Sequence, residues 1–390
     1  LFGNDQIIAV GDTGLDTGIN NPSMHDDFEG RIHAIINYAV TGIGFYGLVC
    51  PPICSTTSAD VNGHGTHVSG SALGDGNKSG SNPFLNTYTN SYAGAAPKSK
   101  IVVVDIGNDD PNSNTVYPGN LFDYLIQGYS NGANIMSNSW NFPGPSTYGD
   151  YTVESNLVDG TANANKNFLI VFATGNTGPG TINPPATAKN TISVGGNDKS
   201  NINSMFFLTA TGPTDDGRIK PDIIAPAMNT ISTRSSVGAF PGGCATSQVG
   251  QYYSTCTGTS MATPVVSGLA ALSREYFQKV REVPNPSAAL IKAALINGAE
   301  DMGYGIPSFT AGWGRANISN SFPSYGITVP TASSSVKHVY FLDNPYGFTA
   351  TGQSYSFNIY PFPNKKIKAT LVWTDRPAMW SSQTLPKLIN

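Results

Sequence analysis

Charged side chains are scarce in this chain of 390 residues, where Asp, Glu, Lys and Arg together make up 12%. An average globular domain has roughly twice that share. The 21 basic and 25 acidic residues leave a formal net charge of −4, and no run of Lys and Arg occurs. Because nucleic acids and anionic membranes are bound through clustered basic side chains, we exclude both as partners.

Long apolar runs are also missing. No stretch of 18 apolar residues occurs, so the sequence predicts no membrane-spanning helix, and it shows no apolar leader segment. The chain begins at Leu1 rather than Met. We therefore expect a mature chain from a zymogen, with its own cleaved propeptide as one partner.

Cysteines are few. Cys50, Cys54, Cys244 and Cys256 permit three pairings. Their positions favour two local bridges, Cys50 with Cys54 and Cys244 with Cys256. Disulfides form in oxidising compartments, so these bridges predict a secreted, extracellular protein. Four buried free thiols are the alternative.

Three short segments carry residues with catalytic chemistry: DTG at 12–14, GHGTH at 63–67 and GTSMA at 258–262. A serine hydroxyl is a weak nucleophile at neutral pH, so acyl-transfer enzymes place an imidazole beside it and a carboxylate behind the imidazole. Of the three chain orders known for this triad, only Asp, His, Ser fits this sequence. The candidate catalytic residues are therefore Asp12, His64 and Ser260.

Each segment alone has a simpler explanation. A second DTG at 16–18 follows the first too closely to supply the facing aspartate of an aspartic protease. His64 and His67 lack the HExxH frame of a zinc site, and Ala262 stands where the GxSxG motif of the α/β-hydrolases has its second glycine. A turn carboxylate, a core histidine and an N-cap serine are each ordinary, but they do not explain the ordered combination.

At these segments the chain resembles the subtilisin-like serine proteases. The resemblance implies a secreted serine endopeptidase that cleaves protein or peptide substrates through an acyl-enzyme. It also implies an oxyanion hole formed by the side chain of Asn176, in the segment ATGNTG, and the backbone N–H of Ser260. The substrate-binding residues implied in the same way are Ser139, Trp140, Asn141, Ala173, Thr174 and Gly175.

The chain departs from the family pattern at Asn141, where the family usually has glycine. A side chain there predicts a narrower cleft and an altered specificity. Two rival hypotheses stay open: a catalytically silent subtilisin-like scaffold that binds a peptide or protein, and an esterase with the same triad.

The proposed chemistry requires no cofactor, although subtilisin-like enzymes often bind structural calcium. Calcium prefers several oxygen ligands. The loop 74–82 is rich in oxygen-bearing side chains, as are Asp105, Asp109 and Asp110. Structural calcium is therefore expected as a possibility, with its ligands unassigned.

Short β-branched runs alternate with helical stretches up to about residue 320, which predicts an α/β fold with a parallel sheet and helices on both faces. We expect strands at 7–10, 101–104, 135–136, 169–172 and 192–194. Helices are expected at 121–129, 153–165, 261–278 and 287–297. A further helix is expected to begin at His64, with Asn62 as its N-cap.

The pattern changes after residue 320. Alternating runs at 338–342, 354–360 and 367–373 predict strands of a partial antiparallel β-sandwich. LVWTD at 371–375 and KLIN at 387–390 resemble the start of a jelly-roll domain in one branch of the family. We therefore predict a subtilisin-like catalytic domain over 1–322 and an incomplete sandwich over 323–390, with a remaining C-terminal fragment as a further partner.

Overall fold

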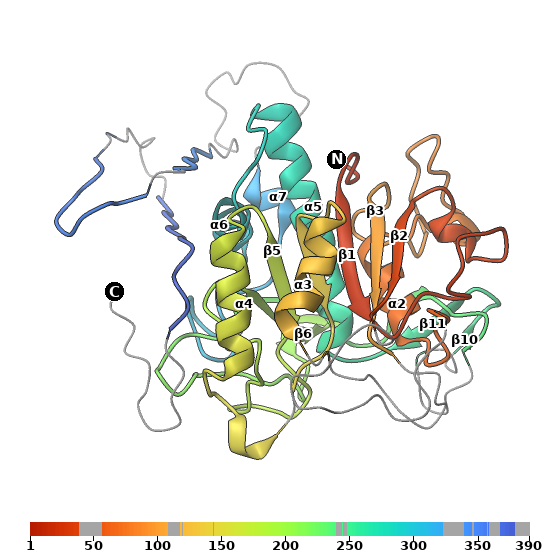
Figure 1. The fold of residues 1–390 in the computed structure, drawn as a ribbon, viewed down its shortest axis with the longest axis horizontal. Helices are drawn as coiled ribbons and strands as arrows, with labels where there is room; N and C mark the ends of the chain where they lie inside the picture. The colour runs from red at the N-terminus through yellow and green to blue at the C-terminus, as the bar shows by residue number, and fades with distance from the viewer. Residues whose placement is uncertain are drawn as a thin grey trace.

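A largely parallel β-sheet lies at the centre of the fold (Figure 1). The computed structural model describes residues 1–38, 57–107, 118, 120–142, 144–238, 244, 248–322, 339–344, 347–356, 358 and 367–378. In this part of the chain the strand order is β2-β3-β1-β4-β5-β6-β7, and β8 also pairs with β6. The strands are β1 (Ile7–Asp12), β2 (Ile32–Asn37), β3 (Lys100–Asp105), β4 (Ile135–Asn138), β5 (Leu169–Ala173), β6 (Ile192–Asp198), β7 (Asn201–Met205) and β8 (Ile223–Pro226).

Only the β6–β7 pair of this sheet is antiparallel among the strands described. A second, antiparallel sheet has the order β10-β11-β9 and consists of β9 (Thr230–Thr233), β10 (Gln248–Val249) and β11 (Tyr253–Cys256). The predicted α/β class with a parallel sheet is confirmed.

Helices cover both faces of the central sheet. They are α2 (His64–Leu73), α3 (Leu121–Ser130), α4 (Val153–Ala164), α5 (Thr259–Val280), α6 (Ala288–Gly298) and α7 (Ile318–Ser321), with short 3₁₀ turns η1 (Asp26–Phe28), η2 (Asn77–Ser79) and η3 (Pro145–Thr147). No helix among the described residues has both the length and the apolarity to cross a bilayer.

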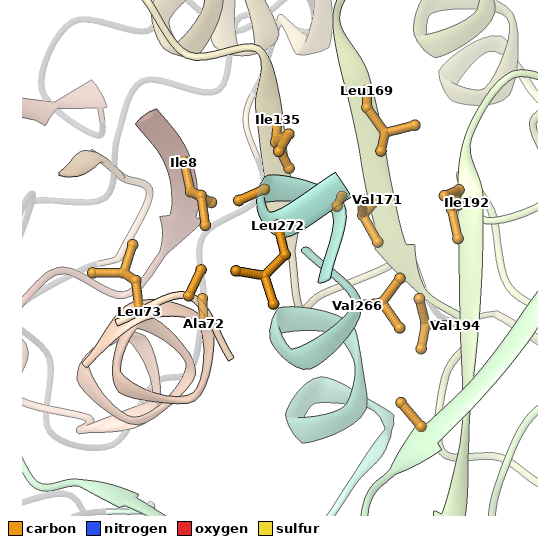
Figure 2. Close-up of a cluster of buried hydrophobic side chains, with 14 of the residues drawn as sticks. Ile8, Ala72, Leu73, Ile135, Leu169, Val171, Ile192, Val194, Val266 and Leu272 are labelled. Carbon is orange, nitrogen blue, oxygen red and sulfur yellow. The ribbon is translucent and has the colours of Figure 1, made fainter. Parts of the chain in front are cut away.

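The core consists of two apolar layers, because successive strand residues point to opposite faces of the sheet. Ile8 packs in one layer with α2 and α5, and Ala9 packs in the other with α3 and α4. Figure 2 shows the first layer, in which Leu272 of α5 lies among side chains of the sheet and α2. This packing fixes the positions of α2 and α5 relative to the end of β1.

The start of α2 differs from the prediction. Gly63, with a φ of 84°, is the N-cap residue, and Asn62 instead accepts a hydrogen bond from the His64 N–H at 3.2 Å. Glycine adopts a positive φ without the steric cost that a β-carbon brings. Sequence reasoning assigned the cap by its side chain, whereas the sharp turn before His64 requires the backbone freedom of glycine.

Helix α5 begins two residues earlier than expected and contains Pro264 within it. Pro264 is the sixth helical residue and so lies beyond the first turn, where the missing N–H of proline would cost nothing. Because proline has no N–H, the carbonyl of Ser260 lacks its donor four residues along the helix. Ser139 Oγ donates to that carbonyl at 2.8 Å instead.

The predicted C-terminal strands are not present among the described residues 339–344, 347–356, 358 and 367–378. A strand is stable only when it pairs with a neighbour. Leu371 and Trp373 alternate as expected, yet they are 77% and 61% exposed. The incomplete sandwich and the domain boundary at 322 stay predictions.

Candidate active site

Asp12 is the last residue of β1, at the carboxyl edge of the parallel sheet and level with Asp105 of β3. Its side chain is 1% exposed. Oδ1 accepts hydrogen bonds from the Thr13 N–H at 2.9 Å and from His64 Nδ1 at 2.7 Å. The strand thus delivers a buried carboxylate to the imidazole.

His64 is the first residue of α2, and its side chain is 23% exposed. Since a carboxylate oxygen only accepts, Nδ1 carries the proton that is shared with Asp12, and Nε2 is left for a second partner. Burial lowers the pKa of His64, but the negative charge and hydrogen bond of Asp12, together with the charge of Asp60, outweigh burial and raise it above 6.5.

Asp60 was not singled out from the sequence. It is buried and accepts four hydrogen bonds, from Thr13 Oγ1, the Gly63 N–H, and the N–H and Oγ1 of Thr66, at 2.6 to 2.8 Å. Burial raises its pKa to about 6 against these donors. Asp60 ties the end of β1 to the first turn of α2. A carboxylate just before a predicted helix start was the signal available in the sequence.

His67 faces away from the candidate site. Its Nε2 lies 3.1 Å from the Thr230 carbonyl and 3.2 Å from the Ser254 carbonyl, both in the antiparallel sheet. Burial and the neighbouring His64 lower its pKa to about 4. His67 therefore joins α2 to the antiparallel sheet as a neutral side chain and does not form a metal pair with His64.

Ser260 is the second residue of α5. Its hydroxyl donates to the Ser139 carbonyl at 3.0 Å, while the Ser139 hydroxyl donates to the Ser260 carbonyl at 2.8 Å. No hydrogen bond joins Ser260 to His64 among the described residues. The structure thus brings Asp12 and His64 into contact and pairs the serine with Ser139.

Asn176 follows β5 and is exposed. Its Oδ1 accepts from the Thr259 N–H at 2.9 Å and from Thr259 Oγ1 at 3.1 Å, one residue before Ser260. These two donors fix the carbonyl end of the amide, so the Nδ2 end points away from Thr259. Nδ2 lies close to Gly258, since a β-carbon at that glycine would be 3.2 Å from it.

Most of the implied substrate-binding residues are buried. Trp140 is 6% exposed and donates from Nε1 to the Gly11 carbonyl at 3.1 Å, so its side chain is part of the core, and its assignment to substrate binding stays a prediction. Ala173, Thr174 and Gly175 are buried as well. The resemblance identified the segments but carried no information on the direction of these side chains.

Asn141 is partly exposed and lies beside the second segment. A β-carbon built on Gly175 would lie 3.2 Å from Asn141 Nδ2. Ser139, two residues before Asn141, contacts Ser260 directly. The two segments therefore approach each other next to the start of α5.

A disulfide joins Cys244 and Cys256, whose Cα atoms are 5.4 Å apart. Cys50 and Cys54 lie outside the described residues, so the second bridge stays a prediction. Asp109 and Asp110 of the calcium proposal also lie outside them.

Calcium binding by the loop 74–82 stays a prediction. The carboxylate of Asp27 beside it accepts hydrogen bonds from the Gly76 N–H at 3.1 Å, the Lys78 N–H at 3.4 Å and the Tyr253 hydroxyl at 3.1 Å. No cluster of three or more His, Cys, Asp and Glu suited to a metal occurs in the described part of the chain.

A buried carboxylate paired with an imidazole, and a serine at the start of a helix beside an asparagine, are the parts expected of a serine protease. The subtilase family matches residues 3–314, and the chain belongs to that family. Its jelly-roll branch stays a prediction. Family membership and the named protease relatives support the predicted enzyme class, a serine endopeptidase.

Serine protease AprX of Bacillus subtilis (strain 168) is 31% identical over 335 residues, which cover 83% of this chain and 67% of AprX. Serine protease/ABC transporter B family protein tagD of Dictyostelium discoideum is 24% identical over 509 residues, which cover 97% of this chain and 27% of tagD. The chain thus spans only part of the relatives it matches.

Solved structures share the fold. The prenylagaramide maturation protease PagA has a TM-score of 0.56 at 21% identity, covering 82% of this chain and 93% of PagA. The patellamide maturation protease PatA gives 0.56 at 22% identity, covering 82% and 96%. At this level of identity the likeness concerns the fold alone.

Proposed function

We propose that this chain is a serine endopeptidase in which Ser260 attacks the scissile carbonyl, His64 transfers the proton and Asp12 holds the imidazole. The 2.7 Å contact between His64 Nδ1 and the buried Asp12 Oδ1 carries the proposal. It fixes the tautomer in which Nε2 is the free base, and the carboxylate stabilises the imidazolium that forms when the base accepts a proton.

The first step forms a bond between Ser260 Oγ and the carbonyl carbon, while the hydroxyl proton moves to His64 Nε2. The resulting oxyanion needs donors. Asn176 Nδ2 is suited to this role because Thr259 holds the other end of its amide. The Ser260 N–H is the second donor, since the first four N–H groups of a helix have no partner within the helix.

The tetrahedral intermediate then collapses. The carbon–nitrogen bond breaks and His64 Nε2 returns its proton to the leaving amine, which leaves an acyl-enzyme on Ser260. Water attacks the acyl carbon, His64 accepts its proton and passes it to Ser260 Oγ as the acid product leaves. The cycle needs no metal or redox cofactor, and the substrate is a protein or peptide.

The Ser260 hydroxyl donates its hydrogen bond to the Ser139 carbonyl and not to His64. This contact favours the rival hypothesis, a silent binding scaffold. Rotation about a single bond, Cα–Cβ of Ser260, moves the hydroxyl from one rotamer to another. Without bound substrate, catalytic hydrogen bonds are often long or poorly aligned, and they tighten only in the substrate complex. We therefore favour the enzyme.

A fluorophosphonate probe separates the hypotheses. The enzyme predicts a covalent adduct that peptide mapping locates on Ser260, and its loss in His64→Ala, which keeps the serine. Folded protein without an adduct would support the scaffold. An esterase would hydrolyse a simple aryl ester and leave a peptide anilide intact, whereas we expect cleavage of both.

We also propose that the chain functions outside the cell. The Cys244–Cys256 disulfide supports this location, because such bonds persist in oxidising compartments. Mass spectrometry of protein secreted by its source cells, without added reductant, tests the proposal. A reduced Cys244 in that material would contradict it.

A further inference from the structure

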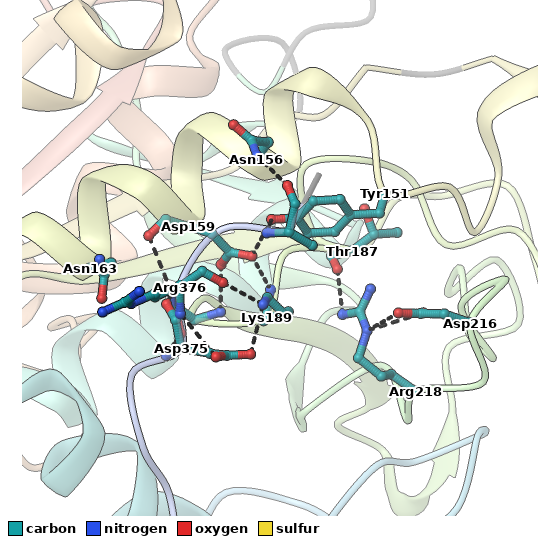
Figure 3. Close-up of polar contacts among 12 residues, drawn as sticks. Tyr151, Asn156, Asp159, Asn163, Thr187, Lys189, Asp216, Arg218, Asp375 and Arg376 are labelled. Atoms are coloured by element: carbon teal, nitrogen blue, oxygen red, sulfur yellow. Dashed lines mark hydrogen bonds and ion pairs between the residues drawn. The ribbon is translucent and has the colours of Figure 1, made fainter. Parts of the chain in front are cut away.

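We call residues 367–378 the tail segment. Polar side chains of the sheet–helix unit contact its main chain, and Figure 3 shows the contacts around Asp375. Asn190 contacts both backbone groups of Asp375: its Nδ2 donates to the carbonyl at 2.8 Å, and its Oδ1 accepts from the N–H at 2.8 Å. Lys189 adds an ion pair to the Asp375 carboxylate at 2.6 Å.

Ala378 is held in the same way. Its N–H donates to the Tyr151 hydroxyl at 3.1 Å, and its carbonyl accepts from Asn156 Nδ2 at 2.5 Å. Asn190, Tyr151 and Asn156 therefore contact main-chain groups, which every residue type possesses. Side-chain amides and hydroxyls satisfy the extended backbone here as a neighbouring strand would.

The other end of the tail segment is attached to the end of α6. Asn297 Nδ2 donates to the Lys368 carbonyl at 3.2 Å and to Thr370 Oγ1 at 2.9 Å. Lys368 Nζ in turn donates to the Ile296 and Ala299 carbonyls, both at 3.3 Å. The last carbonyls of a helix lack partners within it and attract a cation, so Lys368 caps α6.

The surface is held in shape by contacts that do not involve the tail segment. The buried Asp159 of α4 accepts from the Lys189 N–H at 3.1 Å and from the Asn190 N–H at 2.8 Å. Both residues are thus anchored at their backbone while their side chains reach outward. A preformed surface binds an extended peptide with less loss of conformational entropy than a disordered one.

We propose that this surface, formed by Tyr151, Asn156, Lys189, Asn190 and Asn297, is a peptide-docking site whose ligand is the tail segment of the same chain. It holds the C-terminal part in place even when the connecting chain is cut. The contacts support this because they reach both ends of the tail segment. The proposal does not depend on the catalytic one.

The test uses the full chain with a recognition site for a sequence-specific protease inserted at Gly352, in an exposed turn. A Ser260→Ala background limits self-digestion. After cleavage, verified on a denaturing gel, native gel filtration is expected to show both fragments in one peak. Elution of the fragments in separate peaks would overturn the proposal.

Two variants locate the site. Asn190→Ala removes both contacts to the Asp375 backbone, and we expect the cut fragment to dissociate about 10-fold faster or more, since each lost bond contributes a few-fold. Asp375→Ala changes only the tail segment, so faster release there cannot result from misfolding of the catalytic unit. Asn131→Ala is the matched control, because Asn131 bonds to Gln127 within the α3 region. Release at the control rate in both test variants would overturn the assignment of this surface.

Discussion

The two sides of the candidate active site are held differently. On the imidazole side, the buried Asp12 and Asp60 fix His64 and the turn before it through short hydrogen bonds. On the nucleophile side, Ser260 is paired with the backbone of Ser139, and Asn176 is exposed. In the proposed mechanism the fold therefore orients the general base in advance, whereas the nucleophile must change its rotamer before it can react.

Replacing the nucleophile gives the largest expected effect. Ser260→Ala should lower kcat by about 10⁶, the size of this loss in subtilisin, because no hydroxyl is left to attack. His64→Ala should cost a similar factor, and the double variant no more than either, since the two residues act as one unit. Losses that multiply in the double variant would show that they act independently. Peptide anilide hydrolysis measures all three.

Loss of the Asp12 charge comes next. Asp12→Asn should lower kcat by roughly 10⁴, because an amide no longer fixes the imidazole tautomer. Asp105→Asn is the matched control, since Asp105 ends the neighbouring strand at the same register position. An equal loss in both variants would mean that the effect comes from the sheet edge and not from the contact with His64.

The oxyanion donor has an intermediate effect. Asn176→Ala should lower kcat by about 10² to 10³ and leave KM almost unchanged, because the donor contacts charge that exists only in the transition state. Asn141→Ala, beside Gly175, should change KM instead. An unchanged kcat in Asn176→Ala would remove Asn176 from the mechanism.

A substitution at Ser139 tests the nucleophile side while all three proposed triad residues are kept. Ser139→Ala leaves the Ser260 carbonyl without a donor, since Pro264 cannot supply one, and should lower the free energy of unfolding by about 1–3 kcal/mol. The Ser139 carbonyl remains, so kcat should fall less than in Asn176→Ala. Thermal melting with parallel kinetics measures both effects. Full stability in this variant would contradict the role of Ser139.

The smallest expected effect is a shift in the pH dependence of kcat/KM. His64 acts as a base only when neutral, and its pKa lies above 6.5, so kcat/KM should rise with pH through a value above 6.5. Asp60→Asn removes a negative charge that raises this pKa, and the acid limb should move to lower pH. Asp123→Asn, in α3, should leave it unchanged. A limb that moves upward in Asp60→Asn would contradict the electrostatic role.

The sequence predicted β1, β3, β4, β5 and β6 of the central sheet and the helices that bear His64 and Ser260, because apolar runs act locally, but it missed β2, β7 and β8. The three catalytic residues stay candidates from motifs. The sequence did not predict Asp60, since a carboxylate before a helix is common. It gave no direction for the side chain of Trp140, which depends on the Gly11 carbonyl of the neighbouring strand. The short antiparallel strands also escaped notice, because Gln248–Val249 has too few residues to show a period.

The C-terminal region marks the limit of local reasoning. Alternating apolar residues predicted strands at 367–373, yet the described residues there form no sheet and bond to side chains of the catalytic unit instead. Local alternation of apolar residues favours an extended chain, but whether that chain pairs in a sheet depends on residues far away in the sequence.

A crystal structure of the fluorophosphonate-treated protein tests the central claim most directly. We predict phosphorus bonded to Ser260 Oγ, a phosphoryl oxygen within hydrogen-bond distance of Asn176 Nδ2 and the Ser260 N–H, and the 2.7 Å contact between His64 and Asp12 retained. An adduct on another residue, or an oxygen turned away from Asn176 into solvent, would contradict it.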